Sequence, residues 1–186
     1  MNEEMRPEQE LSEILQIRRD KLRALQEDGR DPFRQTKFNR TNWTSEVTGD
    51  YEAMEGKTVS VAGRMMSKRG MGKAIFCHIK DDRGQIQLYI RSDAVTEQEF
   101  ADFRKYDIGD IIGVTGYVFK TKTEEISIHV EQVVLLSKSL RPLPEKFHGM
   151  TNVELRYRQR YVDLIMSDEG RRNFEVRSKF ISYVRR

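Results

Sequence analysis

Three consecutive segments in which apolar residues alternate with other residues constrain the fold of this chain most. They cover residues 59–66, 74–80 and 85–91. Because successive side chains of a β-strand point to opposite faces of a sheet, this period of two indicates strands with one buried face and one exposed face. The residues predicted to be buried are Val59, Val61, Gly63, Met65, Ile75, Cys77, Ile79, Ile86, Leu88 and Ile90.

The predicted exposed face carries side chains that suit contact with nucleobases. Its members are Arg64, Phe76, His78, Gln85, Gln87 and Tyr89. Aromatic rings stack on bases, and guanidinium and amide groups hydrogen-bond to base edges. We therefore predict a platform for single-stranded nucleic acid, with Phe76 as the stacking ring and Arg64 and Gln87 beside it. The alternative is that Phe76 is an ordinary strand residue covered by another segment.

The order of the elements predicts a mainly β fold. A capping-box sequence at 96–99 opens a helix that ends near Gly109, and further strands are expected at 111–120 and 125–136. Three strands, a helix and two strands are the order of a five-stranded oligonucleotide-binding (OB) barrel. The residues of the last strand expected on the outer face are Glu125, Ser127 and His129.

The chain divides into three predicted parts. Residues 1–55 hold a helix at 8–27 and an irregular connection, residues 56–140 form the barrel, and residues 141–186 begin with a proline-containing linker. The last part has helical periodicity but too few apolar residues for a core of its own. Its final helical pattern has no stop signal, which predicts a truncated domain. The expected fold is a barrel with an N-terminal helix and a helical C-terminal segment.

The charge distribution indicates local contacts rather than a polycation. The formal net charge is +3 although 34% of the residues are charged. Basic clusters such as 18–23 and 156–160 attract phosphate in a salt-sensitive way, unless they only solvate a face. No apolar run approaches the length of a membrane span, and the N-terminus lacks a signal-peptide pattern. With Cys77 as the only cysteine, we expect a cytoplasmic protein without a membrane contact.

The sequence offers no recognisable catalytic or metal-binding group. Three histidines and one cysteine lack the spacing of metal ligands. The segment 67–74 superficially resembles a phosphate-binding loop, but Ser67 stands where the first glycine belongs and Ala74 replaces the Ser or Thr. We therefore predict no catalytic residues, no metal site and no cofactor in this chain.

Short motifs resemble the anticodon-binding barrel shared by class II aspartyl-, asparaginyl- and lysyl-tRNA synthetases. They are Gly63-Arg64, Gly72-Lys73, Phe76 and Ile86-Gln87. Longer runs resemble lysyl-tRNA synthetase of bacterial type in particular, and the resemblance extends over almost the whole chain. These runs are residues 18–22, 31–33, 119–123, 140–149 and 156–164.

The resemblance implies roles for particular residues in reading a uridine-rich anticodon. Phe76 would stack on the central base, with Arg64 and Gln87 holding its edge. Glu125 matches an acidic residue used at the anticodon, and Glu124 stands where the family often has glycine. The residues that would meet tRNA phosphates are Lys68, Arg69, Lys73, Lys120 and Lys122, with Arg18, Arg19 and Lys21 on the N-terminal helix.

The family also implies an activity that this chain does not complete. The parent enzyme is a ligase, expected to be a homodimer, that attaches lysine to tRNA(Lys) with ATP and Mg²⁺. The chain stops before the first class-defining motif is complete, so we expect an anticodon-recognition part that is inactive by itself. Residues 156–186 would pack into the catalytic domain and the dimer interface. The alternatives are a stand-alone, sequence-tolerant OB-fold single-strand binder and a protein-interaction module.

Overall fold

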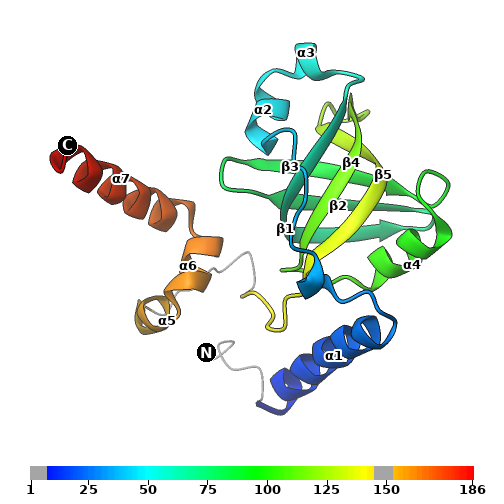
Figure 1. Cartoon of the computed structure of the whole chain (residues 1–186), viewed down its shortest axis with the longest axis horizontal. Helices are drawn as coiled ribbons and strands as arrows, with labels where there is room; N and C mark the ends of the chain where they lie inside the picture. The colour runs from blue at the N-terminus through cyan, green and yellow to red at the C-terminus, as the bar shows by residue number, and fades with distance from the viewer. Residues whose placement is uncertain (1–7, 145–152) are drawn as a thin grey trace. The chain divides into compact units, whose positions relative to one another are not determined.

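The computed structural model describes residues 8–144 and 153–186 (Figure 1). The chain separates into two compact units, Met1–Pro142 and Leu143–Arg186. The second unit begins within the predicted proline-containing linker. Each unit is described by itself.

Five strands of the first unit close into a barrel in the order β1-β2-β3-β5-β4. All neighbouring strands are antiparallel except β3 and β5, which are parallel. Helix α4 (Glu97–Lys105) connects β3 to β4 and begins with the predicted capping box. The predicted OB-fold barrel is therefore confirmed. The strands are β1 (Thr58–Met71), β2 (Ala74–Lys80), β3 (Gln85–Arg91), β4 (Ile111–Lys120) and β5 (Ile126–Ser137).

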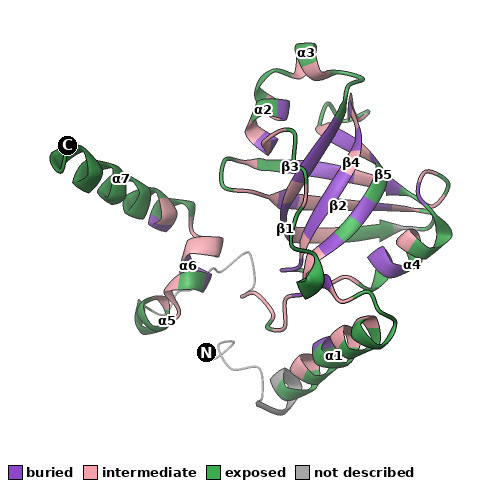
Figure 2. Cartoon of the chain, viewed as in Figure 1, coloured by how far each residue is buried: buried purple, intermediate pink, exposed green. Residues whose placement is uncertain are grey.

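The interior of the barrel is formed by the face that the alternation predicted to be buried. All ten residues predicted for it are buried, and Figure 2 shows the buried positions along the strands. Position 63 on this face is a glycine because β1 and β2 approach closely there: a Cβ at Gly63 would lie 2.9 Å from the Lys80 carbonyl oxygen. Burying a large aliphatic side chain contributes about 1.5–3 kcal/mol, so this interior fixes which residues face outward.

The N-terminal segment contains more regular structure than predicted. Helix α1 (Glu8–Glu27) has the expected bounds. The connection expected to be irregular instead holds a 3-10 turn and two short helices. Val47 of α2 enters the barrel core, and Asp81 accepts hydrogen bonds from the backbone nitrogen and hydroxyl of Thr44, at 2.7 and 2.8 Å. The additional elements are η1 (Pro32–Arg34), α2 (Thr44–Gly49) and α3 (Tyr51–Met54).

The described residues of the second unit are mainly helical, as their periodicity predicted. It contains α5 (Val153–Arg158), α6 (Arg160–Met166) and α7 (Asp168–Val184). Asp163 is buried and ion-paired with Arg156 and Arg160. Among the described residues, no helix combines the length and the apolar character needed to cross a membrane.

Candidate nucleic-acid interface

Five aromatic side chains lie together on the outer face of the barrel, and we call them the ring surface. Phe76 and Tyr89 face each other across β2 and β3, with ring centroids 4.9 Å apart. Tyr89 is 5.4 Å from the His129 ring, and His129 stacks on Tyr117 at 4.8 Å and an interplanar angle of 7°. Phe119 lies 5.8 Å from Tyr89. All five rings are half-buried, so each keeps part of its surface open to a ligand.

A hydrogen-bonded chain of polar side chains lies beside these rings, and we call it the polar network. The Gln87 amide nitrogen donates to the Glu125 carboxylate at 2.6 Å, and the Ser127 hydroxyl donates to the Gln87 amide oxygen at 2.9 Å. The other carboxylate oxygen of Glu125 lies 2.8 Å from His78 Nε2, and His78 Nδ1 lies 2.9 Å from the Ser67 hydroxyl. These contacts fix which side of the Gln87 amide is donor and which is acceptor.

Glu125 is the more exposed partner of the Gln87 amide. The Gln87 side chain is buried, whereas the Glu125 side chain is 44% exposed. The Glu125 carboxylate is therefore more accessible to a ligand than the Gln87 amide is. An ionised carboxylate only accepts hydrogen bonds, so it favours a base that presents an N–H group.

Arg64 does not flank Phe76, contrary to the prediction. It pairs in register with Lys80, whereas the residue opposite Phe76 on β1 is Arg69. The Arg64 guanidinium instead donates to the carbonyl of Gly109 at 2.7 Å. The guanidinium carbon of Arg69 lies 6.0 Å from the Phe76 ring centroid. Arg69 is thus the arginine that the structure brings to the stacking ring.

Lys68 was predicted to contact phosphate, but its ammonium group caps the end of α4. It donates to the carbonyls of Phe103, Arg104 and Tyr106 at 2.6, 3.0 and 2.9 Å. Burial lowers the pKa of Lys68 to about 8. Helix ends leave backbone carbonyls without partners, which explains why a lysine is held here.

Arg18 and Lys21 also have structural partners instead of the predicted exposure to tRNA. The buried Arg18 guanidinium donates to the carbonyls of Ser139, Arg141 and Ile108 at 3.0, 3.1 and 3.2 Å. Lys21 forms an ion pair of 2.7 Å with Asp107. Both contacts fasten α1 to the barrel unit, while Arg19 between them is exposed.

The remaining predicted phosphate contacts lie near two hairpin ends. Arg69 and Lys73 are exposed at the β1–β2 hairpin. Lys120 and Lys122 are exposed at the β4–β5 hairpin, where Lys120 lies 3.3 Å from the Glu124 carboxylate. Their contacts with phosphate stay predictions.

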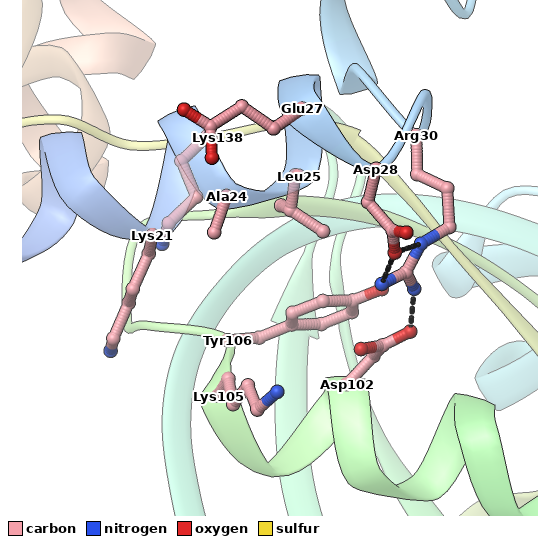
Figure 3. Close-up of a pocket in the computed structure, with 10 residues that line it drawn as sticks. All are labelled: Lys21, Ala24, Leu25, Glu27, Asp28, Arg30, Asp102, Lys105, Tyr106 and Lys138. Carbon is pink, nitrogen blue, oxygen red and sulfur yellow. Dashed lines mark hydrogen bonds and ion pairs between the residues drawn. The ribbon is translucent and has the colours of Figure 1, made fainter.

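A cavity of about 520 Å³ lies between α1 and α4 (Figure 3), and no residue of the ring surface lines it. Three of its charged groups are paired with one another: Arg30 donates to Asp28 at 2.7 Å and also to Asp102. The Tyr106 ring lies against this cluster (Figure 3), and burial raises the pKa of its hydroxyl. These pairs connect the segment that follows α1 to α4.

The β4–β5 hairpin contains a strained residue. Glu124 has φ of +63°, and among the described residues it is the one non-glycine residue with a positive φ. This left-handed conformation costs an L-residue about 1–2 kcal/mol, and the exposed pair with Lys120 offsets less than about 1 kcal/mol. We expect Glu124→Gly to raise the free energy of unfolding by about 1 kcal/mol, measured by urea denaturation. Lys122→Gly, at a residue without positive φ, should lower it; a loss of stability in both variants would contradict the strain.

Comparisons with known proteins agree with this geometry. Residues 59–136 match a family of tRNA anticodon-binding domains described as "OB-fold nucleic acid binding domain". The barrel is therefore an OB-fold similar to the domains of the anticodon-binding class.

Similarity to complete proteins is more specific. The chain is 49% identical to the lysine–tRNA ligase of Clostridium tetani over 97% of its own length. It is 52% identical to that of Thermoanaerobacter pseudethanolicus over 95% of its length. The predicted resemblance to bacterial lysyl-tRNA synthetases is confirmed, and the chain spans 36% of the length of each of these two relatives.

Proposed function

We propose that the outer face of the barrel binds the anticodon loop of tRNA(Lys), as the recognition part of a cytoplasmic lysine–tRNA ligase. The observation that carries this proposal is the position of the ring surface directly beside the polar network. Phe76 offers a ring for a base, and Gln87 lies on the same outer face of the neighbouring strand. Proteins read unpaired bases with this combination of stacking and edge contacts.

The polar network suits uracil. Uracil presents an N–H donor between two carbonyl acceptors. Beyond its bonds to Glu125 and Ser127, the Gln87 amide keeps a second N–H group and a second lone pair that can meet such a base edge. The nearby Glu125 carboxylate attracts the N–H group and disfavours an unprotonated ring nitrogen. Cytosine presents such a nitrogen at the corresponding position. A uridine-rich anticodon is therefore the proposed ligand.

Lysine activation is proposed for other parts of the ligase. Among residues 8–144 and 153–186, no group of three or more His, Cys, Asp or Glu side chains is placed to hold a metal ion. No step with ATP or Mg²⁺ is assigned to the described residues. We expect this chain by itself to bind tRNA without forming an aminoacyl adenylate.

The second unit supports a role for the C-terminal helices in a larger assembly. Its helix α7 exposes Phe180 by 65%, Tyr183 by 80% and Val184 by 66%. Apolar side chains that recur along one helix favour contact with a further domain or subunit. In the proposed ligase these would be the catalytic domain and the second copy of a homodimer.

The test is a titration of the chain with an anticodon stem-loop of tRNA(Lys), followed by fluorescence anisotropy. We expect tighter binding to the loop with a uridine anticodon than to the same loop with a scrambled anticodon. Affinity should fall steeply between about 50 and 200 mM salt, because phosphate contacts release counterions. Equal affinity for both loops would favour a sequence-tolerant single-strand binder, and binding to neither would contradict the proposal.

A further inference from the structure

The ring surface continues well beyond Phe76. At the far end of it, Tyr117 of β4 and His129 of β5 lie opposite each other and stack in parallel, with centroids 4.8 Å apart. The two strands approach closely at Gly116, where a Cβ would lie 2.0 Å from the His129 carbonyl oxygen. This close approach holds the two rings in one stack. Tyr89 lies between this pair and Phe76, in contact distance of both.

The Nδ1 atom of the His129 imidazole makes no hydrogen bond with the described residues. That atom is also buried. Such a group is unfavourable inside a protein and calls for an explanation. Burial, followed by the positive charge of Arg91, lowers the pKa of His129 and so favours the neutral ring. A neutral, flat ring stacked on tyrosine serves as an aromatic face.

The guanidinium group of Arg91 supplies a positive charge near this pair. Arg91 is exposed at the end of β3, and its charge acts on Tyr89, Tyr117 and His129. Its guanidinium holds Asp93 in a bidentate way: Nε donates to one carboxylate oxygen at 2.8 Å and an outer nitrogen donates to the other. Both side chains are exposed, so a phosphate can reach Arg91 and replace Asp93 as its bidentate partner.

We infer that Tyr117 and His129 form a second base-stacking position, separate from that of Phe76, with Arg91 as its phosphate contact. The inference rests on the proposed function, since it assigns a further unpaired nucleotide of the same strand to the same face. The ligand class is single-stranded RNA long enough to reach from Phe76 across Tyr89 to the Tyr117–His129 pair. One base stacks on Phe76, and a neighbouring base stacks on the pair.

The experiment measures the binding of the whole chain to a short fluorescein-labelled oligouridylate. A matched set of probes lacks one base at a time, and the loss of affinity for each probe locates the stacked bases. In the unaltered chain, we expect losses of about tenfold at two or more positions, because stacking on a protein ring contributes roughly that much per base. Loss at only one position would overturn the inference without any variant being made.

Variants assign each position to its ring. In Phe76→Ala, omitting the base that stacks on Phe76 should no longer weaken binding. In His129→Leu or Tyr117→Leu, omitting a different base should no longer weaken binding. His129→Phe keeps an aromatic face and should bind more tightly than His129→Leu does. If position 129 only supported the fold, the two variants would not differ in this way. Tyr183→Leu, an exposed ring of the second unit, is the matched control and should change nothing.

The outcomes separate the two proposals. If Phe76→Ala removes one loss while the Leu variants at 117 and 129 remove none, the second position is wrong and the proposed function stands. If no variant changes any loss, the outer face does not bind the strand, and the proposed function fails with it. Thermal unfolding of each variant shows that the barrel is intact before binding is measured.

Discussion

Phe76→Ala is expected to weaken binding of the uridine-rich anticodon stem-loop by about tenfold to a hundredfold. Stacking of one base on an aromatic side chain contributes about 1–3 kcal/mol, and about 1.4 kcal/mol corresponds to a factor of ten. The Phe76 ring is half-buried, with Tyr89 on one side and Arg69 at 6.0 Å. The methyl group of alanine offers no face to a base. Fluorescence anisotropy at one fixed salt concentration measures the effect.

Two controls distinguish lost stacking from lost stability or charge. Phe76→Tyr keeps the ring and should bind within a few fold of the unaltered chain. Phe180→Ala removes an exposed ring of the second unit and should leave the affinity unchanged. Since neither Phe76 variant alters a charge, the salt dependence should keep the same slope. Unchanged affinity in Phe76→Ala would remove the main support for the proposed function.

The sequence predicted which faces of the strands are buried because the side-chain period of a strand is two. This reasoning placed the ten interior residues correctly and put Phe76, Gln87 and His129 outside. The same alternation continues in β4, where Tyr117 and Phe119 flank the buried Val118. Applying it there would have found the rest of the ring surface.

Register was harder to predict than orientation. Arg64 lies on the outside, yet it is far along the strand from Phe76, because a two-residue turn at 72–73 places Arg69 opposite that ring. A shift in register between Met65 and Ser67 also interrupts the alternation of β1. The alternation indicates only that Arg64 faces outward; the hairpin sets the register and places Arg69, three residues before the turn, opposite Phe76.

The fate of individual basic residues could not be predicted from the sequence. Lys68 and Lys73 lie in the same basic hairpin, but Lys68 folds back onto α4 and Lys73 is exposed. Arg18 contacts carbonyls more than a hundred positions further along the chain. Such partners depend on how α1 and α4 dock on the barrel, which residue type and spacing do not determine.

A buried ion-pair network holds the loop between α4 and β4. Its disruption should lower the free energy of unfolding strongly. The Lys138 ammonium donates to both oxygens of Asp110 at 2.9 and 2.8 Å and to Asp107 at 2.6 Å. Asp110 also accepts from the backbone nitrogens of Ser139 at 2.7 Å and Asp107 at 2.8 Å. The Lys138 side chain is 1% exposed and that of Asp110 is 0% exposed.

Lys138→Met is expected to lower the free energy of unfolding by about 3–5 kcal/mol, because it leaves the buried Asp110 carboxylate without a counter-charge. Urea denaturation followed by the fluorescence of Trp43, the only tryptophan, reports on the barrel unit. Lys21→Met is the matched control: its partner is also Asp107, but its side chain is 32% exposed, so the loss should stay near 1 kcal/mol or less. Adding Asp110→Asn to Lys138→Met should recover part of the stability, since no charge then remains buried alone at position 110. Equal losses for Lys138→Met and Lys21→Met would mean that burial does not set the strength of this network.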